Sequence, residues 1–211
     1  MTKSRADKEA AFWDRFAKYY DRFMSHIYQG QYKDILKMID DELGKDKMVL
    51  EIGTGTGKIA IDISPKAKKV IACDLSPHMI KLAEEKAHAK QINNIAFSVQ
   101  DAYYLDFPDN SFDVVVACNM LHVVQQPGKV LSSIKRVLKQ DGVVVVPTYC
   151  HGQNFSSRTV SKTMGIVGFR AYSRWSADSL QAFLEDQGYI VIKNFLLKST
   201  PPLLYIVCKK I

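Results

Sequence analysis

Apolar residues along the chain follow two patterns that alternate from residue 48 onward. Short continuous apolar runs are typical of buried strands, whereas apolar residues repeated every three or four positions are typical of helices. This criterion predicts strands at 48–52, 70–74, 95–100, 112–118, 142–149, 189–196 and 203–209. It predicts helices at 12–24, 31–42, 57–63, 76–90, 127–138, 157–165 and 176–187. Strands and helices therefore alternate through most of the chain.

This alternation indicates the fold class. Apolar strands separated by helices form a mostly parallel sheet whose two faces are both covered. The last two predicted strands are joined only by a short link that contains STPP at 199–202, so one of them is expected to be antiparallel. We therefore expect an α/β, doubly wound, seven-stranded, mostly parallel sheet with one antiparallel strand near the C-terminus. The helices before residue 46 are expected to form an N-terminal lid.

Composition and charge narrow the function only slightly. The chain has 211 residues and a net charge of +7, with lysines scattered over the predicted helices. A solvated surface is the favoured interpretation, and an anionic substrate, a nucleic acid or peripheral membrane contact are the alternatives. Four dispersed cysteines without a CxxC pair predict reduced core thiols and no metal site. A polar N-terminus and the lack of an apolar run of about 18 residues predict a cytoplasmic protein without a membrane span.

A glycine-rich turn follows the first predicted strand, in the sequence VLEIGTGTGKIA at 49–60. Glycine tolerates positive φ and lets a ligand approach the main chain closely. In sheets of this class, ligands bind beyond the carboxyl ends of the strands, where this turn lies. Asp74 closes the second predicted strand 21 residues after Gly53, where an acidic residue can accept hydrogen bonds from ribose hydroxyls. A plain helix-entry role is the alternative for Asp74.

Four segments then carry a resemblance to a known family: VLEIGTGTG, VIACDLSPHMI, VQDAYYLDFPDNSFDVVVACNMLHVV and IKRVLKQDGVVVV. They resemble, in order and spacing over residues 47–148, the motifs of class I S-adenosylmethionine-dependent methyltransferases. The segment WSADSLQAFLEDQGYIVI resembles the closing helix and strand of that family. The resemblance implies a Rossmann-like fold with S-adenosyl-L-methionine as cofactor and S-adenosyl-L-homocysteine as product.

The resemblance also implies a set of cofactor-binding residues. They are Tyr20, Glu51, Gly53, Thr54, Gly55, Gly57, Asp74, Leu75, Met79, Asp101, Ala102 and Asn119. At the methionine end, Gly53 and Gly55 would pass against the ligand, and Glu51 would orient the loop and the ligand ammonium. Asn119 would lie near the same end, with a turn-capping role as its alternative.

The adenosine end of the cofactor is assigned to residues after the second and third predicted strands. By the resemblance, Asp74 would bind the ribose, and Leu75 and Met79 would lie near the adenine. Asp101 would accept from the adenine amino group, and the Ala102 amide would meet a ring nitrogen. The alternative for Asp101 is that it only begins a loop.

Two residues are candidates for a catalytic role. Eight of the 22 aromatic residues lie between positions 12 and 32. The stretch FWDRFAKYYDRF resembles the entry segment of small methyltransferases that act on quinone precursors, phospholipid headgroups and small metabolites, and Tyr20 matches the tyrosine that closes over their cofactor. A helix that only packs on the sheet is the alternative. His122 follows the fourth strand, where an imidazole with a pKa near 6.5 would be a base or a polar contact for the acceptor, or else a loop residue.

The acceptor class follows from what the sequence lacks. CNML at 118–121 replaces the NPPY-like tetrapeptide used for nucleobase amines, and no Pro-Cys motif for cytosine is present. A small-molecule or lipid-like acceptor is therefore favoured. A nucleic-acid methyltransferase, a non-catalytic S-adenosylmethionine-binding module and a nicotinamide-dependent oxidoreductase are the rival interpretations.

We expect one domain with four segments. They are a helical cap at 1–45, a cofactor-binding core at 46–149, an acceptor-side insertion at 150–175, and a closing helix and strands at 176–211.

Overall fold

The computed structural model describes residues 4–27, 31–166 and 171–211. The helices are α1 (Arg5–Ile27), α2 (Gln31–Asp40), α3 (Lys58–Ile63), α4 (Pro77–Ala89), α5 (Pro127–Val137), α6 (Phe155–Ile166) and α7 (Ala177–Asp186). Two short 3₁₀ turns are η1 (Ser64–Lys66) and η2 (Leu121–Val123). The strands are β1 (Met48–Ile52), β2 (Lys69–Asp74), β3 (Ile95–Val99), β4 (Phe112–Val116), β5 (Leu138–Val145), β6 (Thr148–Tyr149), β7 (Tyr189–Leu197) and β8 (Leu203–Lys210).

Local sequence signals set the ends of two helices. The Ser76 hydroxyl accepts the Met79 amide at 3.1 Å, and Pro77 occupies the first helical position of α4. These residues satisfy one exposed amide and preset the helical backbone. Gly188 follows α7 with a φ of +76°, a conformation that glycine adopts without a steric penalty. Both helix ends lie where the sequence predicts them.

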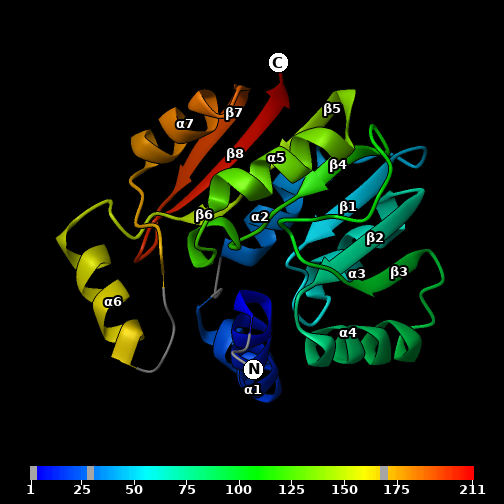
Figure 1. The fold of residues 1–211 in the computed structure, drawn as a ribbon, viewed down its shortest axis with the longest axis horizontal. Helices are drawn as coiled ribbons and strands as arrows, with labels where there is room; N and C mark the ends of the chain where they lie inside the picture. Colours follow the sequence, from blue (N-terminus) through cyan, green and yellow to red (C-terminus); the bar gives the residue numbers. More distant parts are fainter. Residues whose placement is uncertain (1–3, 28–30, 167–170) are drawn as a thin grey trace.

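The strands form one sheet in the order β3-β2-β1-β4-β5-β8-β6. Strand β7 lies off this path and also pairs with β8. Strands β1 to β5 pair in parallel, whereas β8 is antiparallel to β5, β6 and β7 (Figure 1). This arrangement confirms the predicted fold class. In the described part of the chain the sheet has eight strands, because the run predicted at 142–149 is divided at Val146 and Pro147. Proline lacks the amide that a continuous ladder needs.

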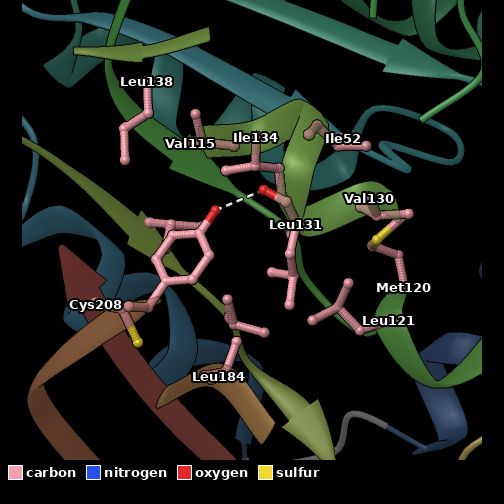
Figure 2. Close-up of a cluster of buried hydrophobic side chains, with 14 of the residues drawn as sticks. Ile52, Val115, Met120, Leu121, Val130, Leu131, Ile134, Leu138, Leu184 and Cys208 are labelled. Atoms are coloured by element: carbon pink, nitrogen blue, oxygen red, sulfur yellow. Dashed lines mark hydrogen bonds between the residues drawn. The ribbon is translucent and has the colours of Figure 1, made fainter. Parts of the chain in front are cut away.

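Two hydrophobic clusters cover the faces of the sheet. One joins β1, β4 and β8 to α5 and α7, and the other joins the strands to α2 and α3. Figure 2 shows the first cluster, in which the Leu131 carbonyl accepts the Tyr189 hydroxyl at 2.7 Å. All four cysteine side chains are buried, as expected for core residues. Because both faces are covered, the carboxyl ends of the strands are left as the place for a ligand.

Helix α1 lies across those carboxyl ends. Asp21 accepts the Thr56 hydroxyl of the glycine loop at 2.5 Å, and Asp14 accepts the hydroxyl of Ser76 after β2. Arg5 forms an ion pair with Asp101 after β3. One helix is thus tied to the loops that follow three neighbouring strands. Among the described helices, none combines the length and apolarity needed to cross a bilayer.

Candidate active site

A cavity lies between α1 and the carboxyl ends of the strands. Nine of the twelve predicted cofactor residues line it: Tyr20, Gly53, Gly55, Asp74, Leu75, Met79, Asp101, Ala102 and Asn119. The fold therefore brings together residues from five separate segments of the sequence.

The three loop glycines have different reasons to lack a side chain. All three have positive φ, at +68°, +54° and +78° for Gly53, Gly55 and Gly57. A Cβ on Gly55 would lie 3.2 Å from Cε1 of Tyr20, and both residues line the cavity. A Cβ on Gly57 would lie 2.7 Å from the Ala83 Cβ of α4, away from the cavity-lining residues. Gly57 thus lets α4 pack closely, whereas Gly55 keeps room for a ligand.

Asp74 fixes the position of the glycine loop. Its carboxylate accepts the amide of Gly55 at 2.9 Å and the amide of Ser76 at 2.9 Å. Burial raises the pKa of Asp74, and these two amide donors partly oppose that shift. The carboxylate also lines the cavity, as an acceptor for ribose hydroxyls must.

Glu51 and Thr54 lie on the other side of the loop. Glu51 is 2% exposed and accepts the Thr54 hydroxyl at 2.7 Å. Burial raises the pKa of Glu51 to about 8, so the group is largely protonated at neutral pH. Both residues line a second cavity behind the loop. Their position suits bracing of the loop, and a ligand ammonium nearby would favour the ionised form of Glu51.

Residues of α1 complete the site near Asp101. The Asp101 carboxylate accepts the Tyr103 amide at 3.0 Å and pairs with Arg5, whose guanidinium carbon lies 3.9 Å from the Tyr103 ring centroid. Glu9 and Trp13 also line the cavity. Arg5 and Glu9 are not among the residues predicted from the sequence, because Arg5 lies 96 residues from Asp101 and the two share no motif.

Asn119 has a left-handed backbone, with φ at +53°. Its amide donates to the Pro147 carbonyl at 2.7 Å, and its side-chain oxygen accepts the Tyr149 amide at 3.2 Å. These bonds join the end of β4 to β6. Non-glycine residues in such conformations are held by their surroundings and are concentrated at functional sites. Asn119 therefore shapes the cavity wall that follows β4.

His122 lies in η2 and is 2% exposed. Its ring centroid lies 5.0 Å from that of His151. Burial lowers the pKa of His122 to about 3 and that of His151 to about 4, so the ordinary value near 6.5 expected for His122 is wrong. Among the described residues that line the cavity, His122 is not included. Its role as a base stays a prediction, and residues 167–170 of the predicted insertion lie outside the described residues.

The strand order, the glycine loop after β1 and the acidic residue that closes β2 define a doubly wound protein that binds a nucleotide-type cofactor. Residues 50–146 match a family model described as "Methyltransferase domain". This match and the curated methyltransferase relatives support a class I S-adenosylmethionine-dependent methyltransferase. They confirm the family resemblance and indicate S-adenosylmethionine as the cofactor.

Two curated relatives and one solved structure illustrate the similarity. A demethylmenaquinone methyltransferase of Renibacterium salmoninarum is 32% identical over 74% of this chain and 65% of its own length. Phosphoethanolamine N-methyltransferase 2 of Caenorhabditis elegans is 27% identical over 81% of this chain and 39% of its own length. The matches therefore span less than two thirds of these two relatives. A methyltransferase solved with the Trm112 activator of Haloferax volcanii has a TM-score of 0.78 at 18% identity, covering 95% of this chain and 96% of its own.

Proposed function

We propose that this chain transfers a methyl group from S-adenosylmethionine to a small-molecule or lipid-like acceptor in a closed cavity. The observation that carries the proposal is the convergence of nine predicted cofactor residues on one cavity covered by α1. Bound S-adenosylmethionine supplies a methyl group already activated on a sulfonium. The protein's work is therefore to bind, align and exclude water rather than to generate a strong electrophile.

Each end of the cofactor has residues suited to hold it. Gly53 and Gly55 offer bare backbone to the methionine end, and Asp74 accepts from the ribose hydroxyls. Asp101 accepts from the adenine amino group, which requires Arg5 to share or leave that carboxylate. Glu51 faces the ammonium from behind the loop. These groups already form hydrogen bonds with other parts of the protein. The loop is therefore preorganised before the ligand binds.

Helix α1 supplies the closure. Tyr20 and Trp13 line the cavity, and their ring centroids are 6.5 Å apart. Aromatic side chains at this position exclude water and narrow the range of approach for an acceptor. Holding reactants in line can contribute several kcal/mol of the barrier reduction. We assign Tyr20 a catalytic role in aligning the reactants and excluding water. In this role it would touch the cofactor, and it would not transfer a proton.

A base is needed only for an acceptor that loses a proton as it attacks. His122 is neutral at pH 7 and can accept a proton, but burial makes its conjugate acid strong and the imidazole a weak base. Chemistry at this site therefore rests mainly on alignment. An acceptor that is already nucleophilic, such as a neutral amine or a thiolate, fits this arrangement.

The acceptor class is supported by the relatives. They are named for demethylmenaquinone, a lipid-like acceptor, and for phosphoethanolamine, a small one. The CNML segment at 118–121 supports the same class, because Cys118 and Asn119 stand where nucleobase enzymes carry NPPY. A nucleic-acid acceptor and a non-catalytic binding module are the competing outcomes.

The test is a methyl-transfer screen with radiolabelled S-adenosylmethionine against cell extract, followed by separation into lipid, small-molecule and polymer pools. We expect label in the lipid or small-molecule pool. Gly55→Val protein should give only background, because its side chain fills the space beside Tyr20. Label confined to a nuclease-sensitive polymer pool would replace the acceptor class. Cofactor binding without any transferred label would identify a binding module.

A further inference from the structure

A second cavity lies behind the glycine loop and is lined by residues of α1, α2, α3 and α4. Three residues, Tyr20, Gly53 and Cys118, line both this cavity and the cofactor cavity. Figure 1 shows α1 and α4 close together below the carboxyl ends of the strands. The two cavities therefore adjoin at the place assigned above to the methionine end of the cofactor.

Another cavity borders the opposite side of the cofactor site. It shares Arg5, Glu9, Trp13 and Val123 with the cofactor cavity. Arg5 pairs with Asp101, so this cavity adjoins the adenine end. A methyl acceptor must reach the sulfonium, which belongs to the methionine end. The cavity behind the glycine loop is the better placed of the two.

The walls of the cavity behind the loop combine apolar and basic side chains. Ile59, Ile61 and Ala89 supply apolar surface, and Lys58, Lys86 and Lys90 supply three ammonium groups. The Lys58 nitrogen lies 3.3 Å from the Tyr32 ring centroid. A cation over an aromatic face is attracted by the ring, so Lys58 is held against Tyr32.

The carboxylates of the same cavity are already engaged. Asp62 accepts the Tyr32 hydroxyl at 2.7 Å and lies 3.7 Å from the Lys58 nitrogen. Asp21 accepts the Thr56 hydroxyl and pairs with Lys86. Buried Glu51 is bonded to Thr54. Burial raises the pKa of Glu51 to about 8, so without a ligand cation the three lysines of the lining outnumber the two remaining carboxylates, Asp21 and Asp62.

We propose that the cavity behind the glycine loop holds the methyl acceptor, and that this acceptor is an amphiphile carrying an anionic group. Its anionic group meets Lys58 and Lys90, its apolar part lies on Ile59 and Ile61, and its reactive atom reaches Tyr20. This inference rests on the proposed function. The acceptor's lone pair forms the new bond to the methyl carbon while the carbon–sulfur pair stays on sulfur, leaving a neutral thioether. The acceptor then gains one positive charge or releases one proton to solvent.

The binding test titrates the protein with octyl phosphate, octyltrimethylammonium and inorganic phosphate by calorimetry, each below its micelle concentration. Octyl phosphate should bind, and the double variant Lys58→Met/Lys90→Met should bind it about tenfold or more weakly. Lys81→Met is the matched control, because Lys81 is an exposed lysine of α4 that is absent from the described lining residues. Circular dichroism checks folding, and Lys58→Gln/Lys90→Gln provides a second pair of substitutions.

Three results would overturn the inference. They are equal binding of the cationic amphiphile, an unchanged affinity in both double variants, or inorganic phosphate binding as tightly as octyl phosphate. The titration is run with and without S-adenosylhomocysteine to separate it from the proposed function. Lysine-dependent binding of octyl phosphate in a protein that does not bind S-adenosylhomocysteine would keep the cavity and refute the methyltransferase role. S-adenosylhomocysteine binding without octyl phosphate binding would do the reverse.

Discussion

Gly55→Ala is the sharpest test of how the glycine loop meets its ligand. Gly55 has a φ of +54°, and an added Cβ would lie 3.2 Å from Cε1 and 3.4 Å from Cζ of Tyr20. The Tyr20 ring cannot retreat freely, because Trp13 and Phe16 pack against it with centroid separations of 6.5 Å and 6.0 Å. The substitution therefore combines backbone strain with a crowded contact at the cavity wall.

The size of the effect follows from these two terms. A left-handed backbone costs an L-residue about 1–2 kcal/mol. For a chain of this length each kcal/mol lowers the melting temperature by about 2–4 °C, so we expect a fall of about 2–8 °C. Displacement of the loop or of Tyr20 into the cofactor space should also weaken S-adenosylhomocysteine binding by about tenfold, or about 1.4 kcal/mol.

Thermal unfolding and calorimetric titration with S-adenosylhomocysteine measure the two effects separately. Gly128→Ala is the matched control, because its Cβ would meet only the flexible end of Gln187, at 2.9 Å from Oε1. Wild-type affinity in folded Gly55→Ala protein would refute the close-approach argument. Combining Gly55→Ala with Tyr20→Leu separates the two causes of weaker binding. Recovered S-adenosylhomocysteine affinity would identify the contact with the Tyr20 ring as the cause. An affinity that stays as low as in Gly55→Ala alone would identify backbone strain.

Three further predictions concern charge and closure. Relative to the wild type, Glu51→Gln should stabilise the cofactor-free protein increasingly as pH rises from 4.5 to about 8. The reason is that the raised pKa of Glu51 makes its ionisation destabilising over that interval. A difference in unfolding free energy that does not change with pH would contradict this. The pKa values of about 3 for His122 and about 4 for His151 lie below the ordinary 6.5, so their contribution to the free energy of unfolding is fully present above pH 6.5 and is lost as pH drops towards 4. His151→Phe should reduce this dependence of the unfolding free energy on pH, measured by urea titration. An equal dependence in the variant would exclude the histidine pair as its cause. Deleting residues 1–28 should leave the sheet folded, because its first strand begins at Met48, yet abolish methyl transfer; normal turnover would refute closure by α1, and loss of folding would show that α1 is structural.

Much of the fold is readable from local sequence. The strand at 48–52, the N-cap at Ser76 and the glycine after α7 are each specified by residues within one or two turns of one another. Periodicity and capping act over such short distances that they can be recognised in the sequence without knowing which elements pack together. The division between β5 and β6 was missed, because VVVVPTY reads as one apolar run and the effect of Pro147 depends on its pairing strand.

The sequence by itself determined the alternation of strands and helices, the bare loop at Gly53 and Gly55, and the acidic residue after β2. Only the tertiary structure decided that Arg5 of α1 reaches Asp101 and that His122 is buried against His151. It also decided that Lys58 and Lys90 line one cavity beside the loop. These contacts join residues far apart in the chain, whose side chains show no common period. Packing of whole elements, rather than neighbouring residues, sets their distances and pKa values.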